Sequence, residues 1–350
     1  MALTSSARGT VYGLAAAVTF GSAAPFATRL GAHLDAELLA GLLYLGAAIA
    51  LVPTVVFGAR TEASLRRSDL PRLGLIVGLG GVIAPVLLLI GLRRTGGLSG
   101  SLLLNLEAPF TVGVAVWMFG EHLGRRSLMA GLAIVGAAAV MGASPGSIRV
   151  DPVGVGLIAG ACAAWALDNN LTAQLSARDP RQIVAAKVFV AGSVNLAIAV
   201  GRGAPIGASS RVAEALALGA VAYGLSVLLD AYALRAAGAA REAALFATAP
   251  FAGVLIAISV FGSRLTTLVG AALVIMLVGV AVLVTDQHGH AHRHAEMLHE
   301  HRHRHDDGHH DHHSGRVQGS VRGWHAHQHR HRPLVHVHPH TSDDHHRHTH

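Results

Sequence analysis

Ten apolar stretches divide the first 285 residues of this 350-residue chain. Short segments that contain Arg, Gly, Pro and acidic residues separate them. Most stretches hold about the 20 residues that a tilted helix needs to cross about 30 Å of hydrocarbon, and the fifth is short. The pattern predicts an all-α integral membrane protein with ten transmembrane helices, over residues 10–30, 37–58, 72–92, 97–119, 127–143, 152–173, 182–201, 212–234, 241–262 and 266–285.

The composition supports a multi-pass membrane protein. Hydrophobic residues make up 52% of the chain, and the mean hydropathy is +0.48. Asp, Glu, Lys and Arg together make up 13%, about half the share that is usual in soluble domains. The first apolar stretch is too long for a typical signal peptide. The single cysteine, Cys162, excludes an intramolecular disulfide and a zinc site built on cysteines.

Small residues recur at every fourth position in two of the stretches, a pattern that lets membrane helices approach closely. Gly13, Ala17 and Gly21 reappear 143 positions later as Gly156, Gly160 and Ala164. Pro109-Phe110 reappears 141 positions later as Pro250-Phe251. The shared offset predicts a tandem duplication, with one five-helix repeat in residues 1–145 and a second in residues 146–285.

An odd number of helices per repeat makes the second repeat enter the membrane from the opposite side. This is the inverted-repeat arrangement of many secondary transporters, whose substrate site lies near the midplane between the repeats. With the N-terminus in the cytoplasm, inside segments carry eleven Arg residues and outside segments seven. Because positive loops favour the cytoplasmic side, we expect both termini in the cytoplasm and the protein in the inner (plasma) membrane.

Residues 286–350 have a different composition. They hold 23 of the 25 histidines, mixed with Arg, Asp and Gly, and predict a disordered, His-rich cytoplasmic tail. Many of these histidines alternate with other residues, so an extended segment would present them on one face. Imidazole is a ligand for transition metals, and the tail is therefore a candidate site for Zn, Ni, Co or Cu. The candidate ligands are His299, His301, His303, His305, His325, His327, His329 and His331.

Glu107 is the leading candidate for function because an ionisable residue deep in an apolar stretch is costly. Asn105 and Pro109 are close by in the sequence. Pro109 lacks an N–H group and frees the carbonyl of Asn105, so a helix break is expected here and at Pro250 in the second half. Glu107 is a candidate for proton coupling or for contact with a substrate cation, and the alternative is a structural hydrogen bond or ion pair. The second half has Thr248 at the matching position.

Three further polar residues are candidates for a substrate or coupling site. Lys187 in the seventh stretch is the only lysine of the chain. It has four interpretations: a pair with Glu107, a pair with Asp168, an anion site, or a side chain that reaches the membrane surface. Asp168 continues the small-residue pattern of the sixth stretch, so we expect it to face a neighbouring helix together with Asn169, in a cavity or in a purely structural role.

The sequence LLLNLEAPF (102–110), followed by FGEHLGRR (119–126), resembles the EamA branch of the drug/metabolite transporter superfamily. LRAAGAAREAALFATAPFAG (234–253) repeats the pattern, and WALDNNLTAQLS (165–176) resembles a subgroup of the same family. The resemblance covers about residues 10–285. It implies a ten-helix alternating-access carrier, often an exporter of small organic solutes such as amino acids, other metabolites or toxic compounds.

We therefore expect a secondary active transporter, and specifically an exporter of small organic metabolites or drugs, with proton coupling through Glu107. The alternative is a divalent metal transporter or metal sensor that uses the tail. No GxxxxGK[ST] motif indicates ATP-driven transport, and an enzyme is not expected. The expected partners are a small-molecule substrate, the lipid bilayer and, as one option, a second copy of the chain; nucleic acid is not expected. No resident cofactor is expected besides metal on the tail.

Overall fold

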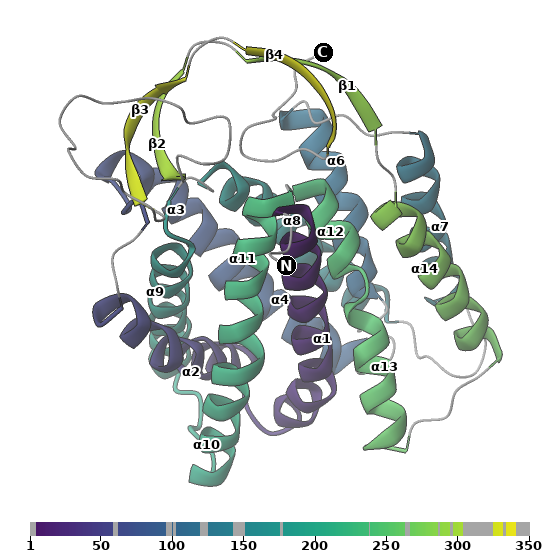
Figure 1. Ribbon diagram of the computed structural model, residues 1–350. Coiled ribbons are helices and arrows are strands. Elements are labelled where there is room, and N and C mark those ends of the chain that lie inside the picture. Colours follow the sequence, from purple (N-terminus) through teal and green to yellow (C-terminus); the bar gives the residue numbers. More distant parts are fainter. Residues whose placement is uncertain are drawn as a thin grey trace.

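The computed structural model describes residues 5–58, 62–95, 100, 103–119, 125–142, 151–175, 178–237, 239–262, 267–285, 288–294, 297–303, 325–331 and 334–340. Helices occupy described residues in each of the ten predicted apolar stretches and form one bundle (Figure 1). The first half holds α1 (Ser5–Gly31), α2 (Ala36–Val56), η1 (Arg67–Asp69), α3 (Leu70–Ile76), η2 (Val77–Ile83), α4 (Ala84–Thr95), η3 (Leu104–Leu106), α6 (Glu107–Phe119) and α7 (Arg125–Gly142). The second half holds α8 (Pro152–Gln174), α9 (Pro180–Gly201), α10 (Ser209–Leu218), η4 (Gly219–Gly224), α11 (Leu225–Ala237), α12 (Ala239–Phe246), α13 (Ala249–Ser259) and α14 (Thr267–Thr285).

Five helical stretches among the described residues are long and apolar enough to cross a bilayer. They are Arg8–Gly31, Ala36–Val56, Arg67–Thr95, Pro180–Gly201 and Ser209–Ala236. The bundle also exposes large apolar side chains, among them Phe57, Trp117 and Leu255, which suits contact with lipid rather than water. These features support a multi-pass membrane protein. The number of membrane crossings and the direction of each one stay predictions.

Aspartate and proline together fix the starts of α8 and α9. Asp151 accepts a hydrogen bond from the backbone N–H of Val153 at 3.0 Å, and Asp179 accepts one from Arg181 at the same distance. Proline follows each cap at the first helical position, where its missing N–H costs nothing. The Arg94 guanidinium donates to Asp151 at 2.8 Å and holds the pKa of that carboxyl below its usual value.

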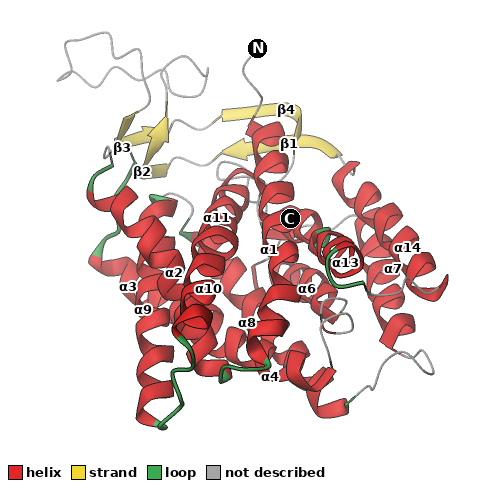
Figure 2. Ribbon diagram, turned by 90° about the horizontal axis from the view of Figure 1, so that it is seen from below, coloured by secondary structure: helices red, strands yellow, loops and turns green. Residues whose placement is uncertain are grey.

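The helix contacts come in matched sets when the two halves are compared. The first helix of each half packs against the third of the other, as α1 with α11 and α8 with α4. It also packs against the fourth, as α1 with α13 and α8 with α6, and the second helices α2 and α9 pack against η4 and η2. The second helices pack on each other, as do the fifth, α7 and α14, which lie together at the edge of the bundle (Figures 1 and 2). This exchange pattern is what a duplicated scaffold with approximate two-fold symmetry would produce.

Matching irregularities interrupt the third and fourth helices of each half. The π-helices η2 and η4 begin 142 residues apart, at Val77 and Gly219. The helices α6 and α13 also begin 142 residues apart, at Glu107 and Ala249, each after a change in backbone conformation. Pro109 and Pro250 lie in the first turn of these helices, where proline is tolerated. The expected breaks therefore lie just before the prolines.

A small residue of the predicted pattern makes a close helix contact in α1, whereas Gly156 of the matching pattern in α8 makes none. A Cβ atom on Gly21 would lie 1.9 Å from the carbonyl oxygen of Ala249, so α1 approaches α13 as closely as expected. A Cβ atom on Gly156 would have no neighbour within 4 Å. The close approach of α8 uses Gly154 against α4 instead, where a Cβ would lie 2.8 Å from that of Arg94. The expectation for Gly156 is wrong because that face of α8 is exposed.

The tail differs from the expected disorder in four short segments. Strands β1 (His288–His294) and β4 (Leu334–His340) pair antiparallel, as do β2 (Met297–His303) and β3 (His325–His331). Figure 1 shows these strands outside the helical bundle. Alternation of histidine with other residues has the two-residue period of a strand, which explains why these segments adopt extended structure. The candidate ligand His305 lies outside the described residues.

Gly21→Ala tests the α1–α13 contact. The added methyl group meets a backbone oxygen that cannot turn away, so we expect a loss of about 1–3 kcal/mol of stability. Gly156→Ala is the matched control and should be neutral or stabilising by up to about 1 kcal/mol, because alanine favours helix. Thermal unfolding of both variants in detergent, followed by tryptophan fluorescence, measures the difference. Equal stability of the two variants would contradict the packing described here.

Candidate functional site

Glu107 is held by an amide from the other half of the chain. It begins α6, directly after the 3₁₀ turn η3, and Asn169 of α8 donates a hydrogen bond to its carboxylate at 2.9 Å. The next residue, Asn170, donates to the backbone carbonyl of Thr111 at 3.0 Å. The structure thus joins two of the predicted site residues, Glu107 and Asn169, across the contact between the halves.

Asp168 and Lys187 form an ion pair between α8 and α9. The two residues are 1% and 6% exposed, so Lys187 does not reach the membrane surface. Thr172 donates a further hydrogen bond to Asp168 at 3.4 Å. Of the interpretations open for Lys187, the structure selects the pair with Asp168. Asp168 faces a neighbouring helix, as predicted.

The π-helix η2 lies against this ion pair, and its backbone carbonyls accept hydrogen bonds from neighbouring side chains. The carbonyl of Gly80 accepts hydrogen bonds from the Tyr44 hydroxyl at 3.1 Å and the Trp165 indole at 3.0 Å. Asn195 donates to the neighbouring carbonyl of Gly81 at 3.1 Å. A Cβ atom on Gly80 would lie 2.0 Å from the Asp168 carboxylate, so only glycine fits here. Sequence reasoning missed this element; its one signal was the Gly80-Gly81 pair within an apolar stretch.

A pocket lies where both halves meet beside Glu107. It encloses about 430 Å³, including the part that opens outward. Its walls come from α1, from the η3–α6 junction and from α12 and α13, with Phe20, Asn105, Glu107, Phe246 and Pro250 among the lining residues. Asn105 is 1% exposed and donates to the sulfur of Met276 at 3.4 Å. Asn105, Glu107 and Pro250 therefore share one pocket, whereas Asp168 and Lys187 lie behind it.

Two more acids lie in the same part of the bundle. Asp230 of α11 is partly buried, and Glu242 of α12 is fully buried. Neither acid is among the site residues predicted from the sequence: Asp230 lies near the end of the eighth apolar stretch, and Glu242 stands at the very start of the ninth. Among the described residues around the pocket, four acids thus face one lysine. The interior favours cations.

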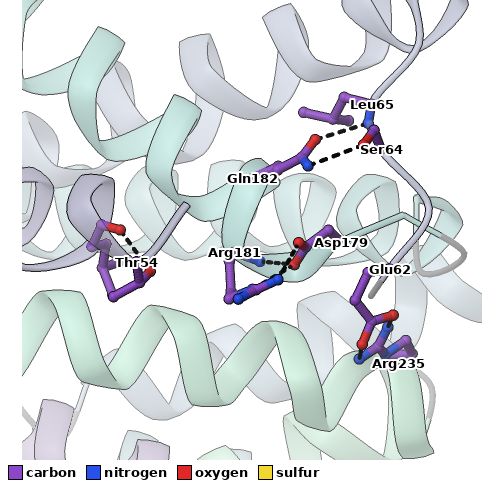
Figure 3. A network of polar contacts seen from close by, with 9 residues as sticks. Thr54, Glu62, Ser64, Leu65, Asp179, Arg181, Gln182 and Arg235 are labelled. Atoms are coloured by element: carbon purple, nitrogen blue, oxygen red, sulfur yellow. Dashed lines mark hydrogen bonds and ion pairs between the residues drawn. The ribbon is translucent and has the colours of Figure 1, made fainter. Parts of the chain in front are cut away.

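Among the described residues, the ion pairs at one end of the bundle are more deeply buried than those at the other end. Figure 3 shows the first of these ends, where Glu62 pairs with Arg235 at 3.0 Å and Asp179 with Arg181 at 2.8 Å. The acid side chains of these pairs are each 3% exposed. Gln182 adds hydrogen bonds to Ser64 and to the backbone N–H of Leu65.

The pairs at the opposite end of the bundle, where α2 and α8 begin and α4 and α9 end, are more exposed. Arg202 pairs there with Glu37, and Arg94 pairs with Asp151 at 2.8 Å. The arginine side chains of these pairs are 69% and 49% exposed, against 20% for Arg235. The end that contains Glu62 is therefore the more tightly sealed one, and its loops are the ones predicted to face the cytoplasm.

No group of three or more His, Cys, Asp or Glu side chains arranged to hold a metal ion occurs in the part of the chain that the structure describes. The predicted tail ligands lie on strands, apart from His305. The register of β2 and β3 sets His299 opposite His329, His301 opposite His327, and His303 opposite His325.

Comparison with known proteins identifies similar transporters. A sequence model of the EamA-like transporter family matches residues 7–143 and 152–285. A relative from Methanothermobacter thermautotrophicus, described as an uncharacterized transporter, is 30% identical over 233 residues, which is 64% of this chain and 67% of the relative. A solved structure described only as a crystal structure of a protein has a TM-score of 0.65 at 16% identity, covering 79% of this chain and 98% of that one. The similarity to this solved structure concerns the fold alone.

Lys187→Met tests the ion pair. Removal of the cation leaves Asp168 charged and buried, which costs about 3–5 kcal/mol. The double variant Asp168→Asn with Lys187→Met removes both charges and should recover most of that stability. A thermal-unfolding cycle of the wild type, both single variants and the double variant gives the coupling. Additive effects of the two substitutions would show that the pair does not contribute as described.

Proposed function

Because the chain belongs to the EamA-like transporter family, we propose that it is a secondary active transporter that exports small organic solutes by alternating access. The observation that carries this proposal is the pocket beside Glu107. It lies between the two halves, and its lining comes from both. Sites between repeats are where alternating-access carriers bind solutes, because movement of one half against the other exposes such a site to each side in turn.

Two interrupted helices support the pocket as the solute site. The helices α6 and α13 both begin beside it, and broken helices in transporters leave polar backbone groups for a ligand. The matched helix contacts of the halves support an inverted repeat, as does the family match over both 7–143 and 152–285. An odd number of spans in each half then reverses the second half in the membrane.

Glu107 is our candidate for the coupling residue. The one lysine nearby is already paired with Asp168, and the partner of Glu107 is the neutral amide of Asn169. A partly buried carboxylate without a cation gains from a proton or from a positively charged solute group. Proton exchange at Glu107 would link solute release to the proton gradient. The Thr248 position in the second half has no such group, so the coupling is asymmetric.

Glu107→Gln tests the coupling. Glutamine retains an acceptor oxygen for Asn169 but cannot exchange a proton at neutral pH, so folding should persist and proton-coupled transport should be lost. Proteoliposomes loaded with a pH-sensitive dye and challenged with a panel of amino acids and cationic drugs measure solute-driven proton movement. Glu214→Gln, at an exposed acid on α10, is the matched control. Undiminished proton movement in Glu107→Gln would exclude this role.

We further propose that the tail binds divalent transition metal. The register of β2 and β3 supports this, because it sets three pairs of histidines opposite one another, all at alternate positions. Opposed positions on one face of a strand pair lie about 4.5–5.5 Å apart at Cβ, close enough for two pairs to share an ion. Neutral imidazole binds Zn, Ni and Cu well, and Co somewhat less tightly.

Truncation after Asp286 tests the tail. Full-length protein in detergent should bind Zn or Ni in equilibrium dialysis at neutral pH, and binding should fall at pH 5 as the imidazoles gain protons. A full-length variant with His299, His301, His327 and His329 changed to Gln should lose most of it. Substitution of four other tail histidines, His345, His346, His348 and His350, is the control. Equal metal binding by full-length and truncated protein would rule out this role.

A further inference from the structure

Two carboxyl groups face each other between α11 and α12. The carboxyls of Asp230 and Glu242 lie within hydrogen-bonding reach of one another. Glu242 is 0% exposed. Neither of its carboxylate oxygens accepts a hydrogen bond from an N–H or hydroxyl group in the part of the chain that the structure describes.

Two carboxyl groups this close together and away from water are stable only when a proton or another cation is bound between them. An ionised carboxylate has acceptors and no donor, so two of them can bond to each other only when one retains a proton. Like charges at this range, away from water, repel strongly and are not ionised together. The described groups whose charges act on the pair are Glu107 on α6, Asp168 on α8 and Lys187 on α9. Among the described side chains, Lys187 is the one cation that acts on the pair, and it is already paired with Asp168.

The helix that carries Glu242 also forms the solute pocket. The helix α12 is eight residues long and ends at the interruption before α13. Ala243, Phe246 and Ala247 of this segment line the pocket, whereas Glu242 points to Asp230 on α11. A solute that moves α12 therefore also changes the distance between the two carboxyls. This geometry connects occupation of the pocket with the state of the carboxyl pair.

We propose that Asp230 and Glu242 form a second proton-carrying site, separate from Glu107, which holds one shared proton when α12 lies against α11 and exchanges it when α12 moves. The pair deepens the proposed function, since its role in transport rests on solute binding in the pocket. That the pair holds a proton when no solute is bound does not depend on transport. The two parts are therefore tested separately.

Infrared difference spectroscopy tests the resting protein. The spectrum of wild type minus Glu242→Gln, in detergent at neutral pH, should contain the carbonyl band of a protonated carboxyl. Asp230→Asn should shift this band, because the protonated Glu242 carboxyl then donates to an amide oxygen in place of a carboxylate, whereas Glu214→Gln should leave it unchanged. Glu107→Gln should also leave it in place, which separates the pair from Glu107. Absence of the band from the wild type would overturn the proposal.

Binding of Na⁺ by the pair, in place of a proton, would also overturn the proposal. If the pair holds Na⁺ instead, thermal stability of the wild type will rise with NaCl over choline chloride, and that of Glu242→Gln will not. Such a result, with no carboxyl band, makes the pair a metal-cation site and the proton proposal wrong. Glutamine can still bond to Asp230, so Glu242→Gln should fold. Its elution profile on size-exclusion chromatography checks this.

Proton counting in proteoliposomes tests the role in transport. With an active solute, Glu242→Gln should move about one proton fewer per solute than the wild type, because the pair shares a single proton. An unchanged ratio alongside a clear infrared band would leave the pair protonated but uncoupled, and would overturn its transport role. Absence of proton movement in the wild type would instead count against the proposed coupling through Glu107, while the infrared result would still decide whether the pair holds a proton.

Discussion

The buried ion pair between Asp168 and Lys187 determines how the other charges of the bundle are accommodated. Lys187 is the only lysine in the chain, and it is committed to a single acid. Burial of a pair is tolerated only with further hydrogen bonds, and Thr172 donates one to Asp168. The remaining acids must find other partners. Glu107 has an amide, and Glu242 has another carboxyl.

The helical scaffold of this protein is duplicated, but the acidic residues around the pocket are not. Helix contacts, π-helices and helix interruptions all recur between the halves at nearly constant spacing. The acids do not recur: Thr248 stands opposite Glu107, and Leu88 stands 142 positions before Asp230. In the proposed alternating-access mechanism, the symmetry would provide two similar states, and the acids that do not recur would provide the groups that distinguish them. A solute and a proton can shift the balance only through such differential contacts.

The apolar stretches themselves were sufficient to locate the helices, because a bilayer requires each spanning helix to be apolar and about 20 residues long. The sequence also singled out Glu107, Asn105, Asp168, Asn169 and Lys187, since polar residues inside apolar stretches are conspicuous. It could not show which acid forms the ion pair with Lys187, because that depends on how α8 and α9 pack. Glu242 was missed because it follows Arg241 at the edge of a stretch, where a charge predicts a loop. The π-helix η2 has no distinctive sequence pattern beyond its glycines.

One helix, α11, carries a residue of the carboxyl pair and a residue of the sealed end that contains Glu62. Asp230 lies five residues before Arg235, which pairs with Glu62 at that end, so the two positions are about 7.5 Å apart along the helix axis. Separating a pair as buried as Glu62–Arg235 leaves a buried charge without its partner and costs more than separating the exposed pairs at the other end, which are typically worth about 0–1 kcal/mol each. Opening the sealed end therefore needs a compensating gain elsewhere. Because α11 carries both Asp230 and Arg235, loss of a proton from the carboxyl pair would push α11 and α12 apart and strain the Glu62–Arg235 contact, which gives proton release a direct route to the seal.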